Sequence, residues 1–99
     1  MFARVSRYRG DTALLRQGFD SVTGELEQLA GFREAYLLVD VDRDRAITVT
    51  LWDDQDALDA SAAAAHEMRT RATVPADASV ESVENYEVAK EVRPAGISG

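Results

Sequence analysis

Cysteine is absent from this sequence of 99 residues, which excludes disulfide bonds, thiolate metal sites and cysteine nucleophiles. Long apolar runs are missing too, because no segment approaches the roughly 20 residues that a helix needs to span a bilayer. Basic residues are few, 11 against 18 acidic ones, and the net charge is -7. Nucleic-acid binding depends on Lys and Arg that neutralise phosphates, so we expect neither nucleic acid nor a membrane as a partner.

The start and the length of the chain set further expectations. Met1 leads directly into a strand-like segment rather than into a signal peptide, so we expect a cytoplasmic protein. A chain of this size buries only roughly two-thirds of the surface that it exposes when unfolded, and self-association is the remaining source of burial. We predict a single domain over residues 1–92 and a flexible C-terminal tail over 93–99, which contains Pro94 and two glycines.

Polarity patterns in the first third of the chain predict a strand and a helix. Residues 1–8 alternate as a strand does, and Asp11 is placed to cap a following helix. Apolar residues spaced by 4, 3, 4 and 3 positions then form one helical stripe: Leu15, Phe19, Val22, Leu26 and Leu29. Together with the helix-stopping Gly31, this stripe predicts a helix over about residues 12–30.

The rest of the chain predicts a hairpin, a helix and a last strand. Two apolar segments, 32–41 and 46–52, are separated by polar turn residues and favour an antiparallel hairpin. Acidic residues then mark the start of a second helix, expected over about 54–72, whose inner face is thin because it is rich in alanine. Residues 80–88 predict the final strand.

The resulting order, strand-helix-strand-strand-helix-strand, is the ferredoxin-like arrangement of the α+β class. It places two helices on one face of a four-stranded antiparallel sheet. Both faces of the central hairpin carry apolar residues. In its first strand Leu37, Val39 and Val41 alternate with Tyr36 and Leu38, and in its second strand Ile47, Val49 and Leu51 alternate with Thr48, Thr50 and Trp52. A large exposed apolar patch is unusual on a monomer, so we expect a homodimer in which two sheets pack face to face. Which face meets the partner is left open.

One segment carries a resemblance to a known family. Residues 47–58, ITVTLWDDQDAL, resemble the antibiotic biosynthesis monooxygenase family, in which a β-rich strand ends in Trp and a few acidic or polar residues precede an Ala-Leu helix start. Gly31-Phe32 is similar to the family's junction into its second strand. The resemblance implies a dimeric α/β barrel with a pocket between sheet and helices in each subunit. Some members oxidise anthrone or quinol substrates with oxygen and no cofactor, others degrade haem, and many have no known role.

The family's functional positions are kept only in part. Trp52 matches the strand-ending Trp, but Thr48 and Leu58 stand where the anthrone-oxidising members have Asn and Tyr. Of the two helix histidines that many members carry, the first position is Ser61 and the second is His66. The second helix lacks the Trp of the haem degraders, which disfavours haem degradation.

The alanine-rich helix either packs closely on the sheet or leaves space above it. If space remains, five residues are expected to line it: Tyr36, Trp52, Leu58, Ser61 and His66. In an oxygenase His66 would be the base, with Trp52 and Thr48 positioning the aromatic ring. The structural alternatives are a buried Trp52 that closes a strand and a His66 exposed on the helix flank.

No metal or cofactor is expected. Residues 40–44 mimic the opening of a calcium loop, but Arg45 and Leu51 occupy the places of its Gly and closing Glu. Two functions follow from the sequence. The favoured one is a non-catalytic dimeric module that binds a small apolar or aromatic ligand or has a structural role. The alternative is a cofactor-independent monooxygenase acting on anthrone- or quinol-type aromatic substrates.

Overall fold

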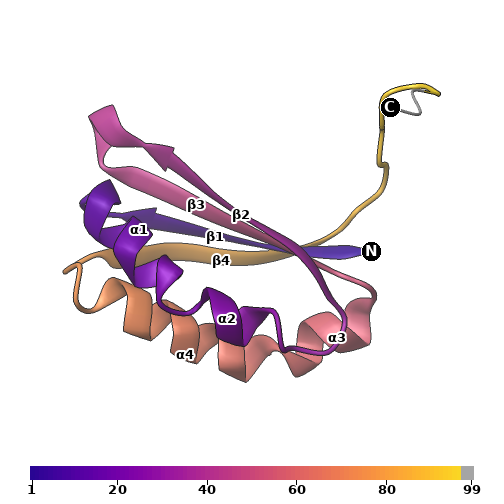
Figure 1. The fold of residues 1–99 in the computed structure, drawn as a ribbon, viewed down its shortest axis with the longest axis horizontal. Coiled ribbons are helices and arrows are strands. Elements are labelled where there is room, and N and C mark those ends of the chain that lie inside the picture. Colours follow the sequence, from indigo (N-terminus) through magenta and orange to yellow (C-terminus); the bar gives the residue numbers. More distant parts are fainter. Residues whose placement is uncertain (97–99) are drawn as a thin grey trace.

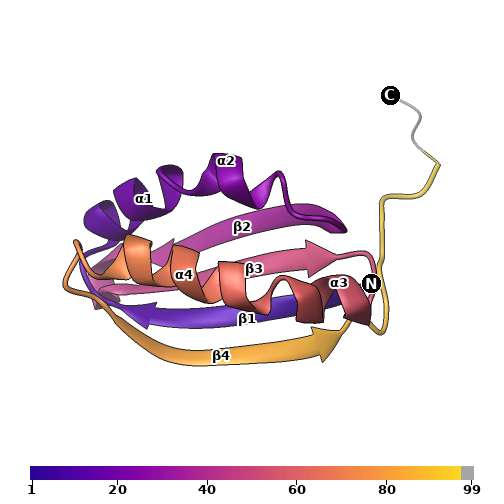
Figure 2. The same cartoon turned by 90° about the horizontal axis from the view of Figure 1, so that it is seen from below.

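Four antiparallel strands form one layer of the molecule, and the helices form a second layer on one of its faces (Figures 1 and 2). A computed structural model describes residues 1–96. In chain order the elements are β1 (Phe2–Arg9), α1 (Thr12–Asp20), α2 (Thr23–Leu26), β2 (Phe32–Asp40), the 3-10 turn η1 (Val41–Arg43), β3 (Arg45–Trp52), α3 (Gln55–Ala60), α4 (Ala62–Thr73) and β4 (Ser79–Glu87). The strand order β2-β3-β1-β4 confirms the predicted ferredoxin-like α+β fold.

After β4 the chain leaves the two layers. Residues 88–96 form neither helix nor strand, and they lead away from the sheet (Figure 1). The end of the predicted tail, residues 97–99, lies outside the described residues. No helix within residues 1–96 is both long and apolar enough to cross a membrane.

Strand β1 lies inside the sheet, and its alternation sorts side chains between the two faces. Arg4, Ser6 and Tyr8 point toward the helices and are 4%, 1% and 1% exposed. Their register partners on β3 are Thr50, Thr48 and Ala46. The helix-covered face of the sheet is therefore mostly polar along β1 and β3, which is unusual for the side that faces a core.

Within residues 1–96 no helix lies over the opposite face of the sheet, and this face is mostly apolar. Val5 pairs with Val49, which in turn pairs with Tyr36 on β2. We call this surface the open face and define it by the residues Val5, Tyr36, Leu38, Ile47, Val49 and Leu51. The sequence did not decide which face of the hairpin lies away from the helices. In the structure it is the face that carries Tyr36 and Leu38.

The first predicted helix is interrupted. The prediction of one helix over 12–30 is wrong in its continuity, because α1 ends at Asp20 and α2 covers four residues. The Ser21 hydroxyl donates to the Gly18 carbonyl at 2.6 Å, and the Thr23 hydroxyl donates to the Phe19 carbonyl at 3.0 Å. Such short polar side chains compete with backbone N–H groups for helix carbonyls and favour a break.

The second predicted helix, 54–72, is likewise two helices, with a break at Ser61. Here the Leu58 carbonyl accepts a hydrogen bond from the Ser61 hydroxyl at 2.7 Å and another from Arg4 Nη2 at 2.8 Å. These side-chain donors satisfy a carbonyl that an unbroken helix would bond to a backbone N–H. The break therefore depends on a residue of β1, far away in the sequence.

Two aromatic pairs pack near opposite ends of the sheet. Tyr8 packs edge-on against Phe19, with ring centroids 5.2 Å apart, and it shares a buried cluster with Leu15, Ala46 and Ala76. Toward the other end of the sheet, Trp52 is fully buried and packs edge-on against Phe32 at 5.6 Å. The first pair joins β1 to α1, whereas the second joins the neighbouring strands β2 and β3.

Helix α1 approaches α4 most closely at Gly18. A Cβ atom at this position would lie 2.4 Å from the carbonyl oxygen of Ala72, which is fully buried. The two helices therefore touch backbone to backbone, and the missing side chain sets their spacing above the sheet.

The variant Gly18→Ala is expected to lower the free energy of unfolding by about 1–3 kcal/mol, because the added methyl group must push backbone away. The gain in helix propensity, about 0.5–1 kcal/mol, is too small to compensate. Gly24→Ala is the matched control, since nothing lies within 4 Å of a Cβ atom there. Urea denaturation of both variants measures the difference, and equal stabilities would contradict the backbone contact.

Candidate functional site

A cavity of about 200 Å³ lies between the sheet and the helices, and we call it the interlayer cavity. Its floor is formed by sheet residues Arg4, Ser6, Tyr8, Ala35, Leu37, Thr48 and Thr50. Its roof is formed by Phe19, Val22, Leu26, Ala65, Met68 and Arg69, and Asp20, Thr23 and Tyr36 complete the lining. The helix side of the cavity is mostly apolar, with Arg69, Asp20 and Thr23 as its polar members, whereas hydroxyl groups and a guanidinium group mark the floor.

The hydroxyl groups of the floor are organised around Tyr8. The Tyr8 hydroxyl lies 2.9 Å from the Thr48 hydroxyl, and either oxygen can be the donor. Burial raises the pKa of Tyr8, while the hydrogen bond to Thr48 opposes that rise. Tyr8 is therefore neutral near pH 7 and acts as a hydrogen-bonding group rather than as a base.

Arg4 brings a buried cation to the same floor. Its Nη1 donates to the Ser61 hydroxyl at 3.1 Å and its Nη2 donates to the Leu58 carbonyl at 2.8 Å. Its guanidinium carbon lies 5.7 Å from the centre of the Trp52 ring, within the range of a cation–π contact. Burial lowers the pKa of Arg4, and the charge of Arg69 lowers it further.

Several residues predicted for the pocket serve this arginine instead of lining the cavity. The Leu58 carbonyl, the Ser61 hydroxyl and the Trp52 ring surround Arg4, while the Trp52 indole N–H donates to Thr50 at 2.9 Å. The structure thus brings these three residues together beside the cavity. Their side chains are buried, and none of the three belongs to its lining.

The other predicted site residues divide into two groups. Thr48 belongs to the lining of the interlayer cavity, and Tyr36 borders the cavity from β2 although its side chain lies on the open face. Tyr36 is also 52% exposed, and its hydroxyl donates to Glu34 at 2.6 Å. His66 is exposed on α4 and does not line the cavity. The structure therefore separates His66 from Thr48, its proposed partner in catalysis.

Arg4 and Arg69 are the site residues that the sequence analysis did not identify. Both left a signal in the sequence. Arg4 alternates in phase with Ser6 and Tyr8 in the first strand, and Arg69 falls on the inner row of the second helix, in line with Ala65 and Ala72. Two arginines on inward-facing rows of adjacent elements predict a cationic interior.

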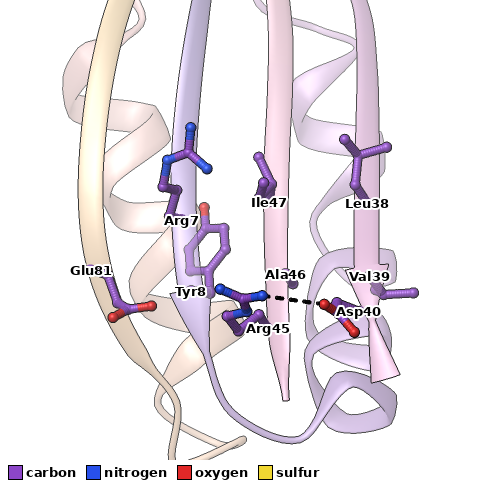
Figure 3. A pocket seen from close by; sticks show the side chains of 9 residues that line it. All are labelled: Arg7, Tyr8, Leu38, Val39, Asp40, Arg45, Ala46, Ile47 and Glu81. Carbon is purple, nitrogen blue, oxygen red and sulfur yellow. Dashed lines mark hydrogen bonds and ion pairs between the residues drawn. The ribbon is translucent and has the colours of Figure 1, made fainter. Parts of the chain in front are cut away.

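A second hollow, of about 330 Å³, lies at the hairpin end of the sheet (Figure 3). Arg7, Leu38 and Ile47 lie side by side there on three neighbouring strands, and the Asp40–Arg45 ion pair, 3.4 Å long, borders them. Arg7 is also 3.8 Å from Glu84. The charged groups at this hollow are exposed and already form ion pairs, so they are not free to bind a ligand. The hollow is a shallow part of the open face, and the interlayer cavity is the stronger candidate site.

The described part of the chain contains no cluster of metal-ligating side chains. Within residues 1–96 no three His, Asp or Glu side chains gather closely enough to hold a metal ion. The chemistry available in the interlayer cavity is therefore hydrogen bonding, cationic attraction and apolar contact.

The variant Tyr8→Phe is expected to lower the free energy of unfolding by about 1 kcal/mol, because Thr48 loses its hydrogen-bond partner in a half-buried position. Thr70→Val is the matched control, since it also removes one hydroxyl hydrogen bond, to the His66 carbonyl, but on the exposed surface of α4. Its effect should stay within about 0.5 kcal/mol. Thermal and urea denaturation test both, and an unchanged Tyr8→Phe variant would contradict the floor network.

No protein-family model and no curated protein matches this sequence. Solved structures are similar to it over nearly the whole chain. A Deinococcus radiodurans protein provisionally assigned as an antibiotic biosynthesis monooxygenase has a TM-score of 0.74 at 14% identity, over 97% of this chain and 100% of its own. SnoaB, a cofactor-independent oxygenase from Streptomyces nogalater, has a TM-score of 0.69 at 20% identity, over 94% and 96%. The haem degrader MhuD from Mycobacterium tuberculosis has a TM-score of 0.72 at 21% identity, over 94% and 100%. At these identities the likeness shows the fold, and the fold of this chain is that of the antibiotic biosynthesis monooxygenases, as residues 47–58 implied.

Proposed function

We propose that this chain is a small-molecule-binding domain whose ligand occupies the interlayer cavity. The observation that carries the proposal is the composition of the lining, an apolar roof over a floor with a few fixed polar groups. Ligand sites in proteins have this composition, because apolar area supplies affinity and sparse polar groups fix orientation. A volume of about 200 Å³ suits a small aromatic molecule.

Binding is better supported than catalysis by the titratable groups of the lining. These groups are Arg4, Tyr8, Asp20, Tyr36 and Arg69. Arginine side chains are hydrogen-bond donors only. Burial raises the pKa of Tyr8 and keeps its hydroxyl neutral, and the Tyr36 hydroxyl donates to Glu34 on the open face. Asp20 is exposed at the end of α1. In the described part of the lining, no group is set up to remove a proton from a buried substrate.

The second candidate is a cofactor-independent oxygenase, and the shared fold with SnoaB favours it. In this reaction an anthrone loses a proton and transfers electrons to oxygen. One oxygen atom enters the substrate as a carbonyl group, and the other leaves as water together with the two hydrogens of the oxidised methylene. Trp52, Thr48 and His66 are the residues assigned to this candidate. The exposed position of His66 makes it the weaker of the two proposals.

The variant Ala65→Leu is expected to weaken binding of the neutral probe 2-naphthamide at least tenfold, because Ala65 is 8% exposed and its side chain borders the cavity. Ala63→Leu, on the exposed side of the same helix, should bind like the unaltered protein. Calorimetric titration measures both affinities. Equal binding by the two variants, or no binding of either 2-naphthamide or 2-naphthoate by the unaltered protein, would overturn the cavity as the site.

Oxygen uptake with dithranol, an anthrone, separates the two candidates. Binding without uptake supports the module, whereas uptake that is lost in both Ala65→Leu and His66→Ala supports the oxygenase.

We further propose that a second copy of the chain covers the open face. Tyr36 is 52% exposed and Leu38 is 51% exposed, and they adjoin the half-buried Val5, Ile47 and Val49. Helices cover only the other side of the sheet (Figure 1). The face also carries both charge signs, Arg7 and Glu84, so a twofold arrangement can match each sign with its opposite.

The variant Leu38→Glu is expected to weaken self-association at least tenfold, because each interface would bury two unpaired carboxylates. Val74→Glu is the matched control, since Val74 is 69% exposed at the end of α4, away from the open face. Sedimentation equilibrium measures the dissociation constants. A monomeric unaltered protein at about 50 µM, a concentration within the micromolar range of ordinary interfaces, would contradict the proposal.

A further inference from the structure

We infer that the molecule bound in the interlayer cavity carries an anionic oxygen group, a carboxylate or an ionised phenol, and that Arg4 and Arg69 recognise it. The inference rests on the proposed function, because it assigns the ligand class of that same cavity. It makes the cavity selective for acidic aromatic molecules over neutral ones of the same shape.

The first support is the unbalanced charge of Arg4. A guanidinium group has five N–H donors, and in the structure Arg4 directs two of its nitrogens to neutral acceptors, a hydroxyl and a carbonyl. The side chain is 4% exposed, so water replaces few of the missing partners. A buried charge is costly unless an opposite charge accompanies it. The structure supplies hydrogen bonds for Arg4 but no anion.

The second support is the contrast with the other arginines. Within residues 1–96, every arginine except Arg4, Arg16 and Arg69 forms an ion pair with an Asp or Glu. Arg16 is exposed to solvent, whereas Arg69 is half-buried and lines the cavity. The two arginines that line the cavity thus lack an ion-pair partner. Because they are buried or half-buried, a carboxylate partner would stabilise them more than it would stabilise an exposed arginine.

The third support is that the two cations act on each other. The charge of Arg69 lowers the pKa of Arg4, which reflects repulsion across the same small space. An anion bound between them would relieve this repulsion and could accept from both guanidinium groups. The Tyr8 and Thr48 hydroxyls on the adjoining floor offer a further hydrogen bond to the same group.

Nearby carboxylates do not provide this balance. Asp20 lines the cavity but is exposed at the end of α1, and Asp59 is exposed on α3. Asp59 raises the pKa of Arg4 by less than burial and Arg69 lower it. Neither carboxylate forms an ion pair with either arginine in the described structure.

A purely structural role explains Arg4 but not Arg69. The hydrogen bonds of Arg4 to Ser61 and Leu58 fix the junction between α3 and α4. The Arg69 side chain makes neither a hydrogen bond nor an ion pair with any residue that the structure describes. Arg69 is therefore the residue whose removal tests recognition without dismantling the fold.

The test compares 2-naphthoate with 2-naphthamide, two probes of the same shape that differ in charge, by calorimetric titration at pH 7. The unaltered protein should bind the carboxylate at least tenfold more tightly. In Arg69→Gln this preference should fall below threefold while 2-naphthamide affinity is kept, which also shows that the variant is folded. Arg16→Gln, which removes one exposed arginine, should retain the full preference.

A second arm uses 4-nitrophenol, whose phenolate absorbs visible light and reports its own ionisation. Bound 4-nitrophenol should ionise at lower pH than free 4-nitrophenol. Such a shift without a preference for 2-naphthoate over 2-naphthamide assigns the site to phenolates. Equal binding of 2-naphthoate and 2-naphthamide with no phenol shift overturns the inference while the proposed function stands. If the unaltered protein binds none of the three probes, both the inference and the proposed function are overturned. If Arg69→Gln keeps the preference for 2-naphthoate, the role of Arg69 is overturned.

Discussion

The buried guanidinium group of Arg4 is the interaction on which the arrangement of this domain depends. It connects the inner strand β1 to the carbonyl of Leu58 and the hydroxyl of Ser61, and so fixes the point at which α3 gives way to α4. It also lies against the ring of Trp52, the strand-ending tryptophan. One side chain therefore links the sheet, the helix break and the most conspicuous aromatic residue, and it presents a positive charge at the floor of the cavity.

The fold could be predicted from the sequence because periodicity is a local property of each element. The stripe from Leu15 to Leu29 and the alternation in the hairpin gave the right element types and order, and the Asp11 cap is present, accepting from the Leu14 N–H at 3.0 Å. The break between α1 and α2 has a local cause in the Ser21 and Thr23 hydroxyls, but the break between α3 and α4 could not be predicted in the same way. At Ser61 the break depends on Arg4, which no local pattern connects to the helix.

The candidate site was predictable in its place but less so in its chemistry. The alanine-rich run correctly drew attention to the space above the sheet, where Ala65 now borders the cavity. Trp52 and Ser61 were expected in its lining because the family resemblance emphasises them, yet both are held beside it around Arg4. Arg4 is a charged residue at an inward-facing position of β1, so a search for apolar periodicity does not select it. It nevertheless supplies the buried positive charge of the cavity floor.

The polarity of the sheet faces departs in part from that expected of a monomer, because the covered face mixes polar groups with the apolar side chains of Leu37, Val39 and Trp52. The covered face carries a guanidinium group and hydroxyl groups, while the face without helices carries valine, isoleucine, leucine and tyrosine. Polar groups between two layers are stable when a partner satisfies them, and apolar groups are stable when something excludes water from them. Both needs are met if a polar-headed ligand enters on one side and a second sheet packs on the other. Because side chains alternate along β1, its polar residues face the helices and Val5 faces the open side. Ligand binding in the cavity and self-association through the open face would each satisfy one of these two sets of side chains.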